Sequence, residues 1–268
     1  MLHRSDRIAE IAAFGPSREP PPLLELANGT VAALRVRKLI SQQACRHLTN
    51  QLRTSGKMVP HADVRGLRVI GLSHFQAARD RKVAKQYFEK AGEVAGTVRK
   101  LAEPFASPFD VALAFLAAAW PAGCQLMKLP TEAPLSPFTV RIYHRGVEIE
   151  PHQDILSAES PTDSVAASLT SQFAANVYLS MPPSGGILEL FDTDDGAANY
   201  TNPLYGSGTI SRGHLAMPVR IEPEIGELII FPCRRIHAVT PSEGSKPRIT
   251  ISFFIGVWDV RSPLAIWA

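Results

Sequence analysis

The sequence has little net charge and no long basic run. Its 268 residues include 28 Lys and Arg and 25 Asp and Glu, a formal charge of +3 at pH 7. The basic residues are scattered, and no group is larger than a pair or a triplet such as Arg35, Arg37 and Lys38. Proteins that bind nucleic acid or anionic membranes by charge need a much larger excess. We therefore expect neither nucleic acid nor a membrane as partner; the composition leaves the oligomeric state open.

Cysteine is rare, and no hydrophobic run is long. Cys45, Cys124 and Cys233 are widely separated and odd in number, so there is no complete disulfide framework and no Cys-x-x-Cys metal site, which favours a reducing compartment. The N-terminal segment, residues 1–8, includes an acid and lacks the apolar core of a secretory signal. The most apolar run, residues 111–120, is far shorter than the roughly 20 residues of a membrane span. The sequence thus predicts a cytoplasmic protein.

Proline and glycine are plentiful, with 22 and 18 copies spread without a period. This excludes collagen and disfavours a purely helical bundle. The first part of the chain still has helical patterns. Ser41 matches the N-cap of a helix, Ser73 and Gln76 form a capping-box pattern, and residues 109–120 are apolar on nearly every side, which predicts a deeply packed helix. In the charged segment after Ser73, the predicted buried face consists of Val83, Tyr87, Val94, Val98 and Leu101.

After Pro121 the sequence is typical of short strands separated by Gly and Pro, which favours a sandwich or barrel. Two polar stretches, residues 156–171 and 192–213, are too long for hairpin turns and are predicted to be lids or binding loops. We expect an α+β protein with a mainly β core and one domain over residues 1–268: a helical layer (1–125) packed on a β-core (126–268). The predicted strands are residues 138–144, 173–180, 187–191, 219–221, 227–231 and 249–257.

Three residues have the spacing of a metal site. His152 and Asp154 follow a predicted strand and project to the same side of an extended chain, because the period of a strand is two. His237 follows a later strand and would complete two imidazoles and one carboxylate, a set that suits Fe(II) and leaves the opposite face open. The alternative is a hydrogen-bonded His–Asp pair at a turn and an ordinary strand-end histidine.

Arg248 begins an alternating core strand eleven residues after His237. A buried guanidinium is costly unless an anion meets it, and a bidentate carboxylate is its natural partner. Pairing with Glu227 or Glu243 is one explanation. Since no acid lies beside Arg248 in its own strand, an external dicarboxylate is the simpler one.

Three segments, residues 141–154, 178–191 and 226–252, together resemble the 2-oxoglutarate- and Fe(II)-dependent dioxygenases, in particular the prolyl-4-hydroxylase-like branch. The resemblance covers less than half of the chain. It implies a double-stranded β-helix (jelly-roll) core with N-terminal supporting helices, and iron bound by His152, Asp154 and His237. It also implies that Arg248 pairs with the distal carboxylate of 2-oxoglutarate, that Tyr143 hydrogen-bonds the same cosubstrate, and that Thr250 points the same way.

The implied reaction couples decarboxylation of 2-oxoglutarate to succinate and CO2 with O2-dependent hydroxylation of an unactivated C–H bond. Fe(II) is the implied cofactor, and ascorbate is a candidate reductant. Related radical halogenases have a small residue in place of the carboxylate, which frees a position for halide; this chain keeps Asp154, which favours hydroxylation or desaturation. We expect the substrate to be a small molecule, a free amino acid or a natural-product intermediate. The alternatives are a peptide or protein prolyl hydroxylase and a non-catalytic cupin-like metal-binding module, which would not require Arg248.

Other residues are open between a structural and a binding role. Asn176 and Tyr178 face one side of their strand, where packing is the expected role, and Gly185-Gly186 is expected to be a turn. Arg234 and Arg235 are candidates for an anionic group of the substrate, as are Arg212, His214 and Trp258, with a solvated loop as the alternative.

Overall fold

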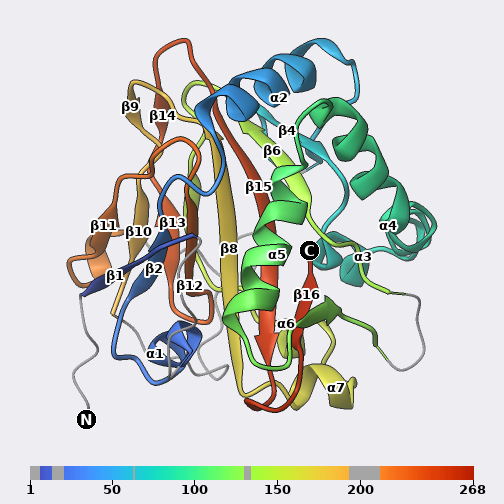
Figure 1. Cartoon of the computed structure of the whole chain (residues 1–268), viewed down its shortest axis with the longest axis vertical. Helices are drawn as coiled ribbons and strands as arrows, with labels where there is room; N and C mark the ends of the chain where they lie inside the picture. The colour runs from blue at the N-terminus through green and yellow to red at the C-terminus, as the bar shows by residue number, and fades with distance from the viewer. Residues whose placement is uncertain (1–6, 14–20, 63, 130–133, 193–211) are drawn as a thin grey trace.

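The computed structural model describes residues 7–13, 21–62, 64–129, 134–192 and 212–268, and it contains two main β-sheets with helices (Figure 1). The larger sheet has ten mostly antiparallel strands. Along its main path they are β1 (Ile8–Ile11), β2 (Ala33–Val36), β12 (Leu228–Pro232), β8 (Ser171–Ser180), β15 (Arg248–Val257), β6 (Thr139–Tyr143), β4 (Leu67–Ile70) and β3 (Val59–Pro60), while β16 (Leu264–Trp267) pairs with β15 and with β5 (Cys124–Leu126).

A second sheet of four strands and a ribbon of two complete the β-structure of the described residues. The four-stranded sheet has the order β11 (Val219–Ile221), β10 (Leu188–Leu190), β13 (His237–Val239) and β7 (Ile149–His152), and the ribbon pairs β14 (Ser242–Glu243) with β9 (Ser184–Gly185). The described helices are α1 (Pro22–Ala27), α2 (Gln42–Thr54), α3 (His74–Arg79), α4 (Arg81–Ala102), α5 (Pro108–Ala119), α6 (Leu156–Glu159) and α7 (Ser164–Ala167), with a 3₁₀ turn at Arg212–His214.

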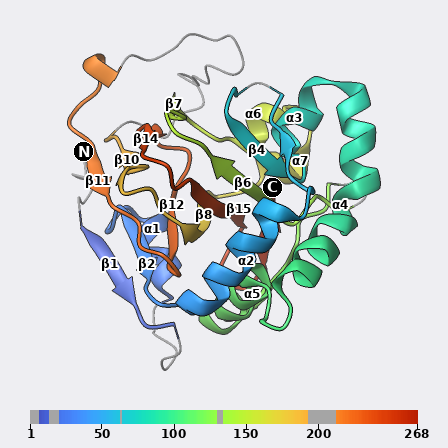
Figure 2. The ribbon, with the colours of Figure 1, turned by 90° about the horizontal axis from the view of Figure 1, so that it is seen from above.

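The large sheet separates an apolar layer from a polar one. Figure 2 shows α2 and α5 on one side of β8 and β15, and β10 and β11 on the other. On the helix side, the alternate residues of β6 and β15, such as Val140 and Ile249, pack with Leu48 of α2 and Phe109 of α5 in the main core. Most of the intervening residues are polar, and Arg141, Arg248 and Ser252 among them line a cavity shared with the small sheet, so this polar face lies inside the molecule.

The helix ends follow the expected chemistry. The Ser41 hydroxyl accepts a hydrogen bond from the amide of Ala44 at 3.2 Å, and Ser73 and Gln76 form the capping box. The segment after Ser73 is not one helix, however. Asp80 has extended backbone angles, ends α3 and caps α4 by accepting from two amides. The buried face of α4 consists of Tyr87, Ala91, Val94, Val98 and Ala102, so Val83 and Leu101 are only partly buried.

The helix predicted at residues 109–120 is α5, and it is less deeply buried than its composition indicates. Phe109, Phe115 and Leu116 are buried, whereas Ala114 and Ala117 are exposed. Alanine has a high helix propensity and little apolar surface, so it costs little on a solvent face. The burial predicted from an apolar run rich in alanine is therefore greater than the burial observed for the helix.

All six predicted strands are present, but the first 125 residues are not purely a helical layer. They also contain β1 to β4, which join the large sheet, and the start of β5 at Cys124. Each is no longer than four residues, too short to show a clear alternation. The segment expected to be a loop at residues 156–171 contains α6 and α7, whose Leu156 and Ala166 are fully buried. Most of the other expected loop, residues 193–211, lies outside the described residues.

None of the helices in the described part of the chain has the length and hydropathy of a transmembrane segment.

Candidate functional site

The small sheet brings the three predicted metal ligands together. His152 ends β7 and His237 begins β13, and the two are direct cross-strand partners. Asp154 follows β7 by two residues, and its Oδ2 lies 3.3 Å from Nε2 of His237 and 3.7 Å from Nε2 of His152. One ligand atom from each residue falls within 4.8 Å of the others. A single ion can therefore reach all three.

Backbone hydrogen bonds orient both imidazoles. Nδ1–H of His152 donates to the carbonyl oxygen of Glu150 at 2.7 Å, and Nδ1–H of His237 donates to that of Arg235 at 3.0 Å. In each ring the proton is thus on Nδ1, and the Nε2 lone pair points toward Asp154. Such a bond to the distal nitrogen fixes the tautomer and the ring plane of a ligating histidine.

The donor set fits Fe(II) in both distance and charge. Metal bonds of ~2.1 Å to imidazole nitrogen and carboxylate oxygen place neighbouring ligand atoms ~3 Å apart, close to the separations found here. Burial, with a smaller contribution from His237, lowers the pKa of His152 to about 4. Burial alone would raise the pKa of Asp154, but the imidazoles and Arg141 lower it below its ordinary value. A neutral imidazole and an ionised carboxylate are the forms that bind metal.

Asp154 is also held through its backbone. Its amide donates to the carbonyl of Cys233 at 2.8 Å, and its carbonyl accepts from the side-chain amide of Gln172 at 3.1 Å. Cys233 belongs to the loop between β12 and β13, and Gln172 belongs to β8. The third ligand is therefore tied to both sheets, which limits the motion of the site.

Arg248 is buried on the polar face of the large sheet, opposite Tyr143 in the register of β15 and β6. Its guanidinium carbon lies 4.4 Å from the ring centroid of Tyr143 and 5.3 Å from that of Tyr178. Nε and Nη1 are buried without a hydrogen-bond partner within the described ranges. Two donors left without an acceptor are costly in the interior, so their position fits an anion that is supplied from outside the chain.

The two internal partners considered for Arg248 are engaged elsewhere. Glu227 forms a bidentate pair with Arg35, with oxygen–nitrogen distances of 2.7 and 2.8 Å to one guanidinium nitrogen and 2.9 Å to Nε. Glu243 is exposed and lies 3.8 Å from Arg145. The structure thus excludes both pairings.

The other residues expected at the cosubstrate site share the face of Arg248. Tyr143 lines the cavity between the sheets. Thr250 is completely buried, and its hydroxyl is hydrogen-bonded to that of Ser252 at 3.1 Å. The Ser252 hydroxyl donates to Oδ1 of Asn176 at 2.6 Å, and both of these residues line the cavity. Thr250 is thereby connected to the cavity through Ser252.

The cavity contains about 540 Å³ of empty space, part of it open to solvent, and the metal ligands and Arg248 lie on its wall. Arg141 lies on the same wall, and sequence reasoning did not single it out. Its signal was present, because Arg141 precedes Tyr143 by two residues in an alternating strand and so shares its face.

Gly186 has a role beyond the expected turn. Its φ of +67° is in the left-handed region that favours glycine, and a Cβ there would lie 3.2 Å from Cδ of Arg248 and from Cγ of Pro182. Glycine at this position gives the stem of Arg248 the space it occupies.

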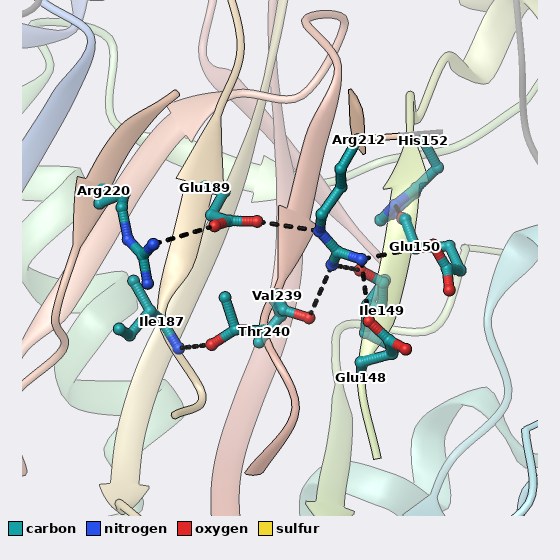
Figure 3. A network of polar contacts seen from close by, with 10 residues as sticks. All are labelled: Glu148, Ile149, Glu150, His152, Ile187, Glu189, Arg212, Arg220, Val239 and Thr240. Atoms are coloured by element: carbon teal, nitrogen blue, oxygen red, sulfur yellow. Dashed lines mark hydrogen bonds and ion pairs between the residues drawn. The ribbon is translucent and has the colours of Figure 1, made fainter. Parts of the chain in front are cut away.

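Arg212 connects three strands of the small sheet (Figure 3). Its Nε donates to Glu189 of β10 at 3.0 Å, and its Nη1 donates to Glu148 at 2.8 Å. Its Nη2 donates to the carbonyls of Ile149 in β7 and Val239 in β13, each at 3.3 Å. Since β7 and β13 carry His152 and His237, Arg212 stabilises the strands on which the site is built. It does not lie free in a solvated loop.

We expect Arg212→Met to lower the free energy of unfolding by about 1–3 kcal/mol, because Glu189 is nearly buried and loses its closest cation. Urea denaturation followed by circular dichroism measures this. Arg220→Met is the matched control: Arg220 lies 3.7 Å from the same carboxylate and is half exposed, so its loss should cost less than about 1 kcal/mol. Equal losses would contradict the role of Arg212.

The remaining binding candidates have internal contacts or are exposed. Arg235 is buried and donates to the carbonyl of Phe191, and Arg234 donates to that of Leu169. Trp258 donates through its indole N–H to the hydroxyl of Ser168, and His214 is exposed.

Comparison with known proteins places the chain in a family. The family model of the carrier-protein-independent halogenase WelO5 matches residues 8–268, nearly the whole chain. The chain belongs to this family. It is a 2-oxoglutarate-dependent non-haem iron oxygenase, with Fe(II) and 2-oxoglutarate as its cofactor and cosubstrate. No curated protein sequence matches the chain.

Solved structures show the same fold at low identity. Crystal structures of an N-substituted L-amino acid dioxygenase from Burkholderia ambifaria AMMD, one of them in complex with alpha-KG, match with TM-score 0.60 and 13% identity over 92% of this chain and 90% of theirs. HygX from Streptomyces hygroscopicus, with nickel, 2-oxoglutarate and hygromycin B bound, matches with TM-score 0.52 and 10% identity over 94% of this chain and 97% of its own.

Proposed function

We propose that this family member hydroxylates an unactivated C–H bond of a small molecule rather than halogenating it. The observation that supports this choice is Asp154. Its carboxylate lies beside both histidine ligands and supplies the third donor of the set. Halogenation requires an open position in place of that carboxylate, and a side chain with Oδ2 at 3.3 Å from Nε2 of His237 fills it.

In this proposal each residue of the site has a distinct role. His152, Asp154 and His237 bind Fe(II), and Arg248 binds the distal carboxylate of 2-oxoglutarate, assisted by the Tyr143 hydroxyl. Thr250 contributes to the cosubstrate site indirectly, through its hydrogen bond to Ser252. The bound iron, 2-oxoglutarate and O2 together supply the oxidant, with one oxygen atom entering the substrate and one entering succinate as CO2 leaves. The chain contributes placement of the substrate and exclusion of water.

The two sheets support a jelly-roll core. We propose that residues 126–268 form a double-stranded β-helix, with residues 1–125 supporting it through helices and through β1 to β4, in one domain of 268 residues. This assignment is based on the arrangement of the two sheets. The small sheet, which carries the proposed ligands, faces the polar side of the large sheet, which carries Arg248.

A small-molecule substrate, a free or modified amino acid or a natural-product intermediate, fits the partly enclosed cavity. The structural neighbours named above, an N-substituted L-amino acid dioxygenase and a protein crystallised with hygromycin B, are consistent with that class. Arg248 argues against the alternative of a metal-binding module without turnover, because its buried donors need an anion.

The decisive experiment is turnover in the presence of chloride. The protein is loaded with Fe(II) and 2-oxoglutarate, supplied with O2 and sodium chloride, and screened against free and N-acetylated L-amino acids for substrate-dependent succinate formation. High-resolution mass spectrometry then identifies the product. We expect one added oxygen atom from the wild type and a loss of that product in Asp154→Gly. A chlorinated product from the wild type would overturn the proposal.

A further inference from the structure

The cavity contains two arginines, and 2-oxoglutarate accounts for one of them. Arg248 has the buried, unsatisfied donors described above. Arg141 lies on the same face, opposite Thr250 in the register of β6 and β15, two cross-strand pairs away from Arg248 and Tyr143. Diagonal neighbours of this kind are ~7–8 Å apart at the backbone, so the two guanidiniums can bind separate anions.

The side chain of Arg141 is positioned but not neutralised. Its Nε donates to the Thr139 hydroxyl at 3.1 Å, which orients the guanidinium plane. Among the described residues no carboxylate forms an ion pair with it, and Asp154 is the only acid on the cavity wall. The positive charge of Arg141 nevertheless acts on the site, because together with Arg248 it lowers the pKa of Tyr143 against the effect of burial.

The charges of the loaded site do not cancel without a further anion. Fe(II) and the two arginines are positive, and 2-oxoglutarate and Asp154 together offset all but one of their four charges. A guanidinium that is partly withdrawn from water is costly unless an anion meets it. One remaining charge calls for a monoanion, and the planar fork of arginine matches a carboxylate best.

The remaining side chains of the cavity wall indicate the polarity of the part of the ligand that Arg141 does not bind. Ile149, Leu188 and Val239 from the small sheet and Phe231 and Phe254 from the large one are apolar. We propose that Arg141 binds the carboxylate of the primary substrate, and that this substrate is a monocarboxylic acid whose apolar body contacts these side chains. This inference rests on the proposed oxygenase function and narrows its substrate class.

The test compares two ligands that differ only in charge. Isovalerate and its uncharged amide, isovaleramide, are titrated without oxygen into protein that holds Fe(II) and saturating 2-oxoglutarate, and binding is followed by perturbation of the visible band of the chelate. We expect isovalerate to bind the wild type roughly 10-fold or more tightly than isovaleramide. Arg141→Met should remove this preference while 2-oxoglutarate binds as in the wild type, and Arg141→Lys should keep part of it.

Three outcomes would overturn the inference. The first is equal affinity of the two ligands for the wild type, and the second is loss of the band because isovalerate displaces 2-oxoglutarate. The third is weakened 2-oxoglutarate binding in Arg141→Met, which is the result expected for Arg248→Met. The wild-type comparison alone decides the first two, so a variant that fails to fold does not prevent the test. A wild type that forms no band with Fe(II) and 2-oxoglutarate would instead contradict the proposed function. The two failures are thereby distinguishable.

Discussion

Replacing His237 with alanine is expected to weaken Fe(II) binding by on the order of 100-fold or more and to abolish turnover. Loss of a residue that merely orients a ligand already costs about 10–100-fold, and His237 is a proposed ligand itself. Its ring is buried, and its Nε2 lies 3.3 Å from Oδ2 of Asp154, so alanine removes a nitrogen donor from the interior of the proposed site. Anaerobic titration with Fe(II) and 2-oxoglutarate, followed by the visible band of the chelate, measures the loss.

His144→Ala is the matched control, because His144 is exposed and follows β6 outside the triad. It should bind Fe(II) as the wild type does. Circular dichroism should give the same spectrum for both variants. If the His237 variant kept the band, with His152→Ala behaving identically, the triad would not be the iron site.

Arg248→Met is expected to weaken 2-oxoglutarate binding by about 100-fold or more while leaving Fe(II) affinity largely unchanged. Removing one partner of a buried charge pair typically costs 2–5 kcal/mol, and methionine keeps the apolar contacts of the stem with Tyr143 and Tyr178. The measurement is the 2-oxoglutarate concentration that gives half of the visible band at saturating Fe(II).

Arg145→Met serves as the control, since Arg145 is exposed and its nearest acid, Glu243, lies 3.8 Å away. This variant should match the wild type in both affinities. Simultaneous loss of Fe(II) and 2-oxoglutarate binding in Arg248→Met would show a structural role for Arg248 instead of a cosubstrate role.

Two of the three proposed metal ligands could be grouped from the sequence because their spacing encodes their geometry. An extended chain projects residues two apart to one side, which groups His152 with Asp154. The pairing of His152 with His237 was not accessible. Strands β7 and β13 have four and three residues, too few for a periodic signal, and the register that places the two histidines opposite each other forms only when the small sheet closes.

Arg212 illustrates the same limit. It lies in a segment whose polarity is compatible with a solvent-exposed surface. Arg212 is instead engaged by Glu148 and Glu189, which are 41 positions apart in the chain. Glu189 belongs to β10 and Glu148 directly precedes β7, and these two strands lie on either side of β13. Contacts between distant segments depend on which strands become neighbours, and the local composition of a segment does not predict its neighbours.

The sequence by itself determined six strands of the second half of the chain and the start of α2, and it supplied the candidate site residues, since these depend on local propensity and on a period of two. The tertiary structure decided where the polar face of the large sheet points. Alternation in β6 and β15 says that one face is apolar and the other polar, and a polar face ordinarily meets water. Here the four-stranded sheet covers it, so Arg141, Tyr143 and Arg248 line a partly enclosed cavity together with the proposed iron ligands. This burial makes the polar stripe a candidate binding site, because donors and charges shielded from water require partners.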